Sequence, residues 1–266
     1  MFPIRAIHQI EMTSRCQLSC KYCAHPKMAR PKIDMDDLTY AKALLWARQL
    51  PGPELNLAGI GESTMHPEFV RNVFLAREAV GPDVPLILAT NGILMTREMA
   101  LAIAPTQIRV WVSLHRPERA GPAVEALKEA GIIAGVSSDA AIEAVDWAGQ
   151  VKWHVSTHQK GMPCPWVKNG RVFVLADGRL ARCCFDATAD DIIGTVDDDV
   201  PSLKTAPYRL CSSCHLDVGV SFPSSPAGTG LTVQVTSHRQ TGRPDSIKTQ
   251  EAQVPYRHVA GGTSVP

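Results

Sequence analysis

The sequence CQLSCKYC, residues 16–23, places three cysteines in one short loop. It directly follows residues 4–12, IRAIHQIEM, whose pattern predicts a β-strand. Three thiolates can ligate three irons of a four-iron cubane, which leaves the fourth iron open to a small molecule. A zinc site with His25 as its fourth ligand is the alternative, although the spacing is less typical of zinc. We therefore interpret Cys16, Cys20 and Cys23 as ligands of an iron–sulfur cluster.

Beyond this loop, strand-like and helix-like stretches alternate along the chain, about six times in all. Further strands are expected at residues 54–60, 85–92, 107–114, 132–138 and 151–157. Helices are expected between them at residues 34–50, 67–80, 96–104, 123–131 and 140–149. Because parallel strands need crossover helices, the pattern predicts an α/β fold with a parallel sheet and helices outside it. Chemistry in such barrels takes place at the carboxyl ends of the strands, where the cysteine loop falls.

Several local signals refine this prediction. The expected helix faces are Leu38, Ala41 and Leu45 in the first helix and Phe69, Val73 and Ala76 in the second. Asp34 and Thr96 are the expected N-caps of the first and third helices, and Gly81 is expected to end the second. Residues 85–92, PLILATNG, form a short and nearly continuous apolar run. Such a run predicts a strand that is buried on both faces.

Composition excludes several classes of protein. The chain has 266 residues, of which 45% are hydrophobic and 20% charged, as is usual for a globular protein. A net charge of +1 gives no support for binding nucleic acid or an anionic membrane through bulk charge. No apolar run is long enough to span a bilayer, and the first residues lack the pattern of a secretory signal. We expect a cytoplasmic protein with reduced thiols, in which eight cysteines indicate metal or cluster ligands.

The cysteine loop and four later motifs together resemble the radical S-adenosylmethionine (SAM) superfamily. Residues 4–160 carry the resemblance, which implies a partial (β/α)6 barrel. Each of these motifs falls at the carboxyl end of an expected strand or beside it. The motifs are Tyr22 before the third cysteine, Gly59-Ile60-Gly61-Glu62, Thr90-Asn91-Gly92, Ser113, and Gly131 to Gly135 with Val136.

The resemblance implies a [4Fe–4S] cluster whose open iron is chelated by the amino and carboxylate groups of SAM. The backbone at residues 59–62 would receive the amino group, and Glu62 would supply negative charge. Tyr22, Asn91, Ser113 and Val136 are the further cofactor-binding candidates, because they fall where relatives contact the methionine, ribose and adenine of SAM. Reductive cleavage would give a 5′-deoxyadenosyl radical that abstracts hydrogen from a bound substrate. Taken singly, Gly59-Ile60-Gly61 and Thr90-Asn91-Gly92 are also compatible with simple turns.

A second group of cysteines follows residue 160. Cys164, Cys183, Cys211 and Cys214 number four, which suits a fully ligated auxiliary cluster or a tetrahedral zinc knuckle. Asp177-Gly178 predicts the turn of a hairpin formed by residues 171–176 and 179–185. The segment resembles the SPASM/twitch auxiliary domain, and the resemblance favours a second [4Fe–4S] cluster used in electron transfer. Cys184 is ambiguous, because it can replace Cys183 as a ligand or simply pack.

These features divide the chain into three expected parts. Residues 1–160 form the partial barrel, residues 161–220 the twitch-like domain, and residues 221–266 a mostly disordered tail that is rich in Ser, Thr, Gly and Pro.

A local basic cluster lies around the first cysteine loop. Its members are Lys21, His25, Lys27, Arg30 and Lys32. A solvated loop is one interpretation, and a patch for an anionic substrate or for a flavodoxin- or ferredoxin-like electron donor is the other. His154, His158 and His115 follow expected strands and are candidates for proton transfer or substrate contact.

The leading functional hypothesis is a radical SAM enzyme that oxidises or rearranges a small polar metabolite, sugar or nucleotide. We expect a compact barrel without an additional N-terminal peptide-binding domain, which favours a small substrate. Peptide modification is the first alternative, because SPASM/twitch relatives often modify peptides. Modification of a DNA or RNA base is the second, which the local basic loop permits but the overall charge does not support. A zinc-binding structural or interaction protein is the alternative from another class.

Overall fold

A computed structural model describes residues 2–137, 147–152, 164, 166, 169–198, 202–203, 210 and 214. All of these lie within one compact unit, Met1–Ser221. The α-helices are α1 (Asp37–Gln49), α2 (Phe69–Val80), α3 (Arg97–Ile103) and α4 (Pro117–Glu129). The short 3-10 helices are η1 (His25–Lys27), η2 (Ser63–Met65) and η3 (Ala104–Thr106). The strands are β1 (Phe2–Pro3), β2 (Ala6–Ile10), β3 (Pro51–Asn56), β4 (Leu86–Thr90), β5 (Arg109–Ser113), β6 (Ile133–Ser137), β7 (Arg171–Val174), β8 (Arg179–Ala181), β9 (Ile192–Thr195) and β10 (Ser202–Leu203).

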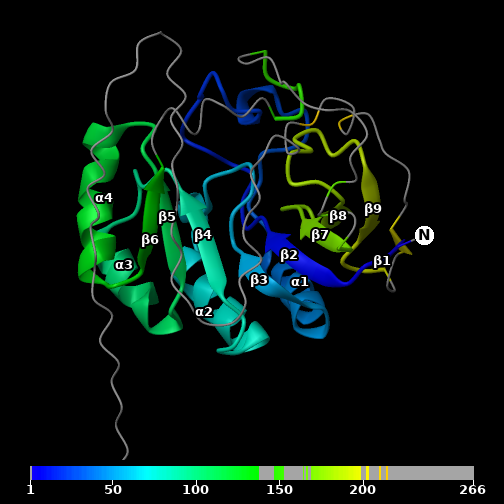
Figure 1. The fold of residues 1–266 in the computed structure, drawn as a ribbon, viewed down its shortest axis with the longest axis horizontal. Coiled ribbons are helices and arrows are strands. Elements are labelled where there is room, and N and C mark those ends of the chain that lie inside the picture. Colours follow the sequence, from blue (N-terminus) through cyan, green and yellow to red (C-terminus); the bar gives the residue numbers. More distant parts are fainter. Residues whose placement is uncertain are drawn as a thin grey trace, which may run out of the picture. The chain divides into compact units, whose positions relative to one another are not determined.

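One eight-stranded sheet organises the described residues (Figure 1), in the order β6-β5-β4-β3-β2-β7-β8-β9. Neighbouring strands from β6 to β7 run parallel, and β7, β8 and β9 run antiparallel. Helices α1 to α4 lie side by side in chain order. The predicted α/β fold of a partial barrel is confirmed. The expected sixth barrel strand lies largely outside the described residues, as does the helix before it.

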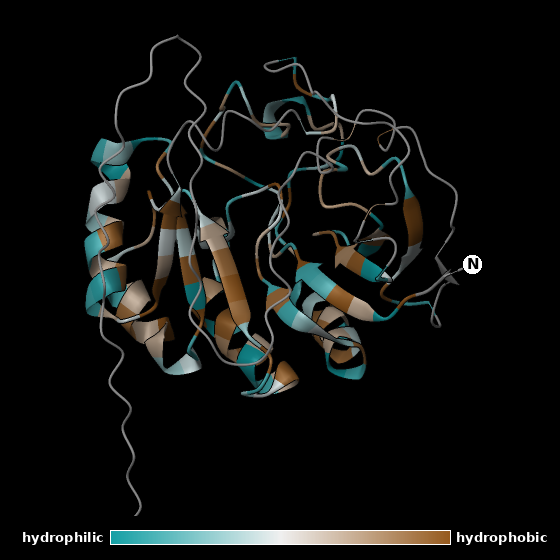
Figure 2. Ribbon diagram, in the orientation of Figure 1, coloured by the Kyte–Doolittle hydropathy of each residue, from teal (hydrophilic) through white to brown (hydrophobic). Residues whose placement is uncertain are grey.

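The core lies between the sheet and its helices. Leu86 and Leu88 of β4 and Val110 and Val112 of β5 are fully buried there. Figure 2 shows that β4 is predominantly hydrophobic, whereas α4 alternates between hydrophobic and hydrophilic residues. The prediction that residues 85–92 are buried on both faces is wrong for one face, because Ala89 is exposed. The strand alternates because the helices cover only the face that carries Leu86 and Leu88.

Helix α1 departs from the expected face and cap. Leu38 and Leu45 are 64% and 55% exposed, and Tyr40 and Leu44 are buried instead. The Tyr40 hydroxyl donates to the Asn72 carbonyl oxygen (2.8 Å), so this large side chain is buried with its polar atom satisfied. The expected face and the expected Asp34 cap are therefore wrong.

The cap of α1 is Asp36, whose carboxylate accepts from the backbone N–H of Thr39 (2.9 Å). Asp34 accepts instead from the hydroxyl of Thr13 (2.7 Å) and from Arg15 (2.9 Å), at the base of the cysteine loop. Its carboxylate is thus engaged in tertiary contacts that a local pattern does not reveal.

Other local predictions are confirmed. Phe69, Val73 and Ala76 are buried along α2, and Gly81 ends this helix with a φ of 74°. The Thr96 side chain caps α3 by accepting from the N–H of Met99 (3.1 Å). Strands β7 and β8 form the predicted hairpin.

The hairpin is continuous with the barrel sheet, because β7 pairs in parallel with β2. The His8 ring on β2 lies 4.5 Å from the Trp166 ring and 5.6 Å from the Phe173 ring, measured between centroids. His8 is only 5% exposed. Its burial, together with the positive charge of Arg171, lowers its pKa to about 4. Trp166 and Phe173 of the C-terminal segment thus pack on a histidine that is neutral at pH 7.

We expect His8 to make stability depend on pH. An unfolded histidine binds a proton below about pH 6.5, whereas the folded chain resists this proton until about pH 4. Stability is therefore complete above the unfolded pKa and falls as the pH drops between these two values. Between about pH 7.5 and pH 5, the wild type should lose roughly 2 kcal/mol more than a His8→Phe variant. Urea unfolding at both pH values measures this difference, and equal losses in the two proteins would contradict it.

Candidate functional site

The three-cysteine loop follows β2 and presents its thiols at the carboxyl end of the parallel strands. Cys20 is buried, and Cys16 and Cys23 are half-buried. The N–H of Leu18 donates to the Cys16 sulfur (3.4 Å), and the N–H of His25 donates to the Cys23 sulfur (3.4 Å). Backbone donors of this kind stabilise thiolates and the clusters that they ligate. The donor set therefore fits three ligands of an iron–sulfur cluster.

The thiols themselves need a cation. Burial raises the pKa of Cys23 to about 11, and the neighbouring Cys20 and Cys16 also raise it. Burial likewise raises the pKa of Cys16, with smaller contributions in the same direction from Glu62 and Cys20. Such thiols stay protonated until a metal displaces the proton, because the metal's charge offsets both burial and mutual repulsion.

Side-chain hydrogen bonds fix the base of the loop. The Ser14 hydroxyl donates to the carbonyl oxygen of Pro31 (3.0 Å), and His25 Nε2 lies 3.0 Å from the carbonyl oxygen of Ser14. Arg15 pairs with Asp34 and donates to the Met65 carbonyl oxygen (3.0 Å). These contacts hold the two ends of the loop against each other.

Close packing accounts for Gly59 and Gly61. A Cβ atom on Gly59 would lie 2.3 Å from Glu11 Cγ, and one on Gly61 would lie 2.2 Å from the Thr13 carbonyl oxygen. The N–H of Glu62 donates to the Arg15 carbonyl oxygen (2.7 Å). The segment after β3 thus lies directly on the start of the cysteine loop, and only glycine fits at both positions.

Glu62 joins the ends of β3 and β4. This carboxylate is 3% exposed. Its Oε1 accepts from the N–H and the hydroxyl of Thr64 (3.2 and 2.7 Å) and from the Thr90 hydroxyl (2.7 Å), and its Oε2 accepts from the N–H of Asn91 (2.8 Å). Its expected contact with the amino group of SAM stays a prediction.

Two further bridges hold the loop to the next strand ends. Gln17 Nε2 donates to Asn91 Oδ1 (3.0 Å), and Asn91 Nδ2 lies 4.0 Å from the Cys16 sulfur. The Tyr22 hydroxyl lies 2.5 Å from His115 Nδ1. The fold therefore brings Cys16, Tyr22 and Asn91 to one site, together with His115 and Glu62. The amide bridge through Gln17 was not predicted, and no local pattern signals it.

The remaining expected contacts lie farther along the sheet. Ser113 is half-buried at the end of β5, opposite Ser137 of β6. Val136 is 43% exposed. Gly135 is required by packing, because its Cβ would lie 2.2 Å from the Trp111 ring. His154 and His158 lie outside the described residues.

The later cysteines also gather. A hydrogen bond with Cys183 and burial raise the pKa of Cys184 well above its usual value, and the nearby thiols of Cys164 and Cys214 raise it further. The fold therefore brings these four cysteines together, while Cys211 lies outside the described residues. Cys184 also packs against the buried cluster of Phe173, Leu175 and Ala181. Whether Cys183 or Cys184 ligates stays open.

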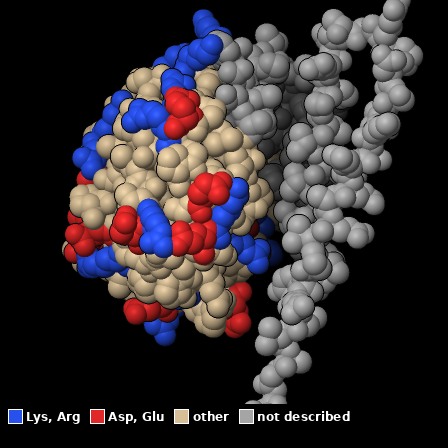
Figure 3. Space-filling model, turned by 90° about the vertical axis from the view of Figure 1, so that its left-hand side faces the viewer, with Lys and Arg blue, Asp and Glu red and all other residues tan. Residues whose placement is uncertain are grey.

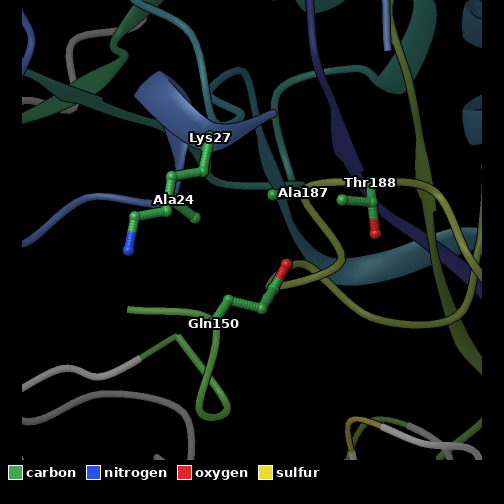
Figure 4. A pocket seen from close by; sticks show the side chains of 5 residues that line it. All are labelled: Ala24, Lys27, Gln150, Ala187 and Thr188. Atoms are coloured by element: carbon green, nitrogen blue, oxygen red, sulfur yellow. The ribbon is translucent and has the colours of Figure 1, made fainter. Parts of the chain in front are cut away.

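The expected basic patch is smaller than predicted. Arg30 and His25 are buried, because Arg30 pairs with Glu11 and His25 contacts the Ser14 carbonyl. Lys21, Lys27 and Lys32 are the exposed members. A cavity of about 240 Å³ lies beside Lys27 and is also lined by Ala24, Gln150, Ala187 and Thr188 (Figure 4).

Within the described part of the chain, no three His, Cys, Asp or Glu side chains converge closely enough to hold one metal ion. A cubane does not require such convergence, because each thiolate binds a different iron. His25 Nε2 is engaged by the Ser14 carbonyl, a contact that metal-bound histidines also make with their second ring nitrogen, so the zinc alternative with His25 stays a prediction. None of the helices in the same described part has the length and apolar character needed to cross a bilayer.

Comparisons with known proteins bear on residues 10–162, which match the family model of the Radical SAM superfamily. The tungsten-containing aldehyde ferredoxin oxidoreductase cofactor-modifying protein of Pyrococcus furiosus is 38% identical over 98 residues, or 36% of this chain and 26% of that protein. The PqqA peptide cyclase of Gluconobacter oxydans is 33% identical over 86 residues, or 32% of this chain and 23% of that protein. The matches thus span about a quarter of each relative.

Solved structures share the fold. BtrN in complex with AdoMet and 2-DOIA has a TM-score of 0.62 at 17% identity, over 74% of this chain and 80% of that one. The anSMEcpe structure with bound AdoMet and Cp18Cys peptide has a TM-score of 0.51 at 14% identity, over 73% of this chain and 78% of that one.

The packing at Gly61 yields a test. Gly61→Ala places a Cβ against backbone oxygens that cannot rotate away, so we expect a loss of roughly 3 kcal/mol in the free energy of unfolding. Gly121 is the control, because it lies in α4 and a Cβ there would meet no atom within 4 Å outside its chain neighbours. Gly121→Ala should change the free energy of unfolding much less, because alanine favours the helix while the following Pro122 disfavours a Cβ at this position. Urea unfolding measures both, and a neutral Gly61→Ala would refute the close approach.

Proposed function

Because the chain belongs to the radical SAM superfamily, we propose that it is an enzyme acting on a small polar metabolite, sugar or nucleotide. It abstracts a hydrogen atom from this substrate at the carboxyl end of the barrel strands. The observation that carries the proposal is the set of Cys16, Cys20 and Cys23, held by a pre-formed loop beside Asn91 and Tyr22. Residues 10–162, which match the family, include this set.

Cys16, Cys20 and Cys23 would hold a [4Fe–4S] cluster, with SAM at the remaining iron. When bound, the reduced cluster would supply the one electron that splits SAM into methionine and the 5′-deoxyadenosyl radical, which would take a hydrogen atom from substrate. The protein's part is to position the reactants and exclude water. Asn91 and Gln17 orient the loop at Cys16, and His115 holds Tyr22 against the end of β5.

Cys164, Cys183, Cys211 and Cys214 are the proposed ligands of an auxiliary [4Fe–4S] cluster. This assignment is supported because Cys164, Cys183 and Cys214 each lie near Cys184. Four thiolates leave no iron open, so the role is electron transfer or shaping of the pocket. A flavodoxin- or ferredoxin-like donor supplies the electrons, and Lys21, Lys27 and Lys32 are exposed charges that suit an acidic donor.

Peptide modification is the second candidate function. It is supported by the similarity to the PqqA peptide cyclase and by the shared fold with anSMEcpe, whose structure holds a peptide. The first choice draws support from the fold of BtrN, whose complex holds 2-DOIA. A nucleic-acid substrate finds no comparable support. On the face drawn in Figure 3 acidic and basic side chains are interspersed. Exposed ion pairs such as Arg97–Glu129 and Lys128–Glu125 likewise balance positive charge with negative charge.

Cysteine replacement tests the cluster assignment. Anaerobically purified protein should be brown and carry about eight irons per chain, four for each cluster. Replacing Cys16, Cys20 and Cys23 with Ala should abolish release of 5′-deoxyadenosine from SAM and dithionite and lower the iron content to about four. Replacing Cys211 and Cys214 should also lower the iron content to about four, yet spare this release. Colourless protein containing only zinc would contradict the proposal.

The class of substrate can be tested with deuterium. Cells of the native host are grown in deuterated medium, and their extract is divided into a low-molecular-mass fraction and a peptide fraction. The wild-type enzyme should transfer deuterium into 5′-deoxyadenosine with the low-molecular-mass fraction, and protease treatment should not abolish the transfer. Protease-sensitive transfer from the peptide fraction alone would favour the second candidate function.

A further inference from the structure

A buried ion pair joins the end of β2 to the end of the cysteine loop. Arg30 donates two parallel hydrogen bonds to the Glu11 carboxylate, at 2.7 and 2.8 Å. The two side chains are 3% and 1% exposed. Neither residue belongs to the proposed cluster or SAM contacts. Burying such a pair costs desolvation energy, so its value lies in fixed geometry rather than in stability alone.

The remaining bonds of the pair reach three other segments. Glu11 Oε1 accepts from the N–H of Ile60 (3.0 Å), and Oε2 accepts from the N–H of Ala176 (3.1 Å). Arg30 Nε donates to the carbonyl oxygen of Ala187 (3.2 Å). One pair thus binds the cysteine loop, the segment after β3, the β7–β8 turn and the segment after Cys184.

The contact at Ala187 extends to the auxiliary cysteines. The N–H of Asp186 donates to the Cys183 carbonyl oxygen (3.2 Å). The Asp186 carboxylate accepts from the N–H groups of Asp190 (3.0 Å) and Asp191 (2.9 Å) and is 1% exposed. Residues 183–191 therefore form a tight turn, so a bond to Ala187 also fixes the position of Cys183 and Cys184.

Apolar packing adds to the contact between residues 24–30 and Ala187. Ala24 and Met28, which flank η1 after the cysteine loop, share a small buried cluster with Ile60, Val151 and Ala187. Figure 4 shows Ala24 beside η1 and Ala187 on the facing segment. Apolar contacts alone are not directional, whereas a bidentate guanidinium–carboxylate pair fixes orientation. The pair therefore selects one docking geometry among those that the apolar contact permits.

We propose that Glu11 and Arg30 are positioning residues that dock the turn carrying Cys183 and Cys184 onto the loop carrying Cys16, Cys20 and Cys23. The pair thereby sets the separation of the two clusters. The second statement rests on the proposed function, because it requires an auxiliary cluster. The docking itself does not, because it involves only protein groups.

Arg30→Lys tests the proposal. Lysine keeps the positive charge beside Glu11 but loses the fork of donors and the bond to Ala187. In the anaerobically purified protein, amide hydrogen exchange should become at least about tenfold faster in residues 24–30 and 183–189. In the dithionite-reduced holoenzyme, the magnetic interaction between the two clusters should change in electron paramagnetic resonance, with the iron content unchanged.

Arg77→Lys is the matched control. Like Arg30, Arg77 donates three hydrogen bonds, but to the carbonyl oxygens of Thr106, Gly81 and Val84 at the far end of α2. It should lower the melting temperature without altering exchange at residues 183–189 or the magnetic interaction. Equal effects of the two variants would reduce the pair to a general stabilising role and overturn the proposal.

A second variant guards against misfolding of the first. Glu11→Gln with Arg30→Met leaves no unpaired charge and keeps one acceptor for the backbone N–H groups. It should show the same faster exchange at residues 183–189, and unchanged exchange would overturn the docking. A wild type that holds only about four irons, unaffected by Cys214→Ala, would refute the auxiliary cluster instead. The exchange data would still decide the docking.

Discussion

The Glu11 carboxylate at the end of β2 is the constraint on which the arrangement of the site depends. It accepts hydrogen bonds from the segments after β3 and β7 and from the end of the cysteine loop. Its side chain also occupies the space that a Cβ at Gly59 would need. Because a buried charge must be fully paired, each of these segments is held to one position. The site is therefore assembled around an acidic residue that lies outside the proposed set of cysteine ligands.

Glu62 makes a similar set of hydrogen bonds after the next strand of the sheet, β3. It too is buried, and it accepts from backbone and hydroxyl donors at the ends of β3 and β4. The carboxyl end of a parallel sheet is where loops leave the ladder and their N–H groups lose strand partners. Carboxylates there satisfy these donors and stiffen the loops. The segments that would contact a cofactor are thus built onto rigid strand ends, where small errors of position cost the most in rate.

Local patterns predicted most of the fold, and contacts between residues that are distant in the sequence explain the rest. Four expected strands (β2, β4, β5 and β6), the α2 face, the Thr96 cap and the Asp177-Gly178 hairpin follow from periodicity and turn chemistry, which act over a few residues. Strand β3 begins and ends earlier than expected, at Pro51–Asn56. The α1 face was mispredicted because two apolar stripes compete, and only tertiary contact with Asn72 decides for Tyr40. Arg30 was assigned to an exposed basic patch because its partner, Glu11, lies 19 residues away in the sequence. A glutamate ending an apolar strand was the available signal.

At the cysteine loop, the polypeptide orders the backbone and a bound metal is needed to ionise the thiols. Hydrogen bonds from Ser14, Gln17 and Tyr22 order the loop through protein groups alone. Ligand binding therefore costs little further conformational entropy of the loop. Burial meanwhile raises the pKa of Cys23 and so favours the neutral thiol. Ionising these neighbouring thiols then requires the positive charge of bound metal. The loop is thus ordered by protein contacts, whereas the ionisation of its thiols depends on the metal.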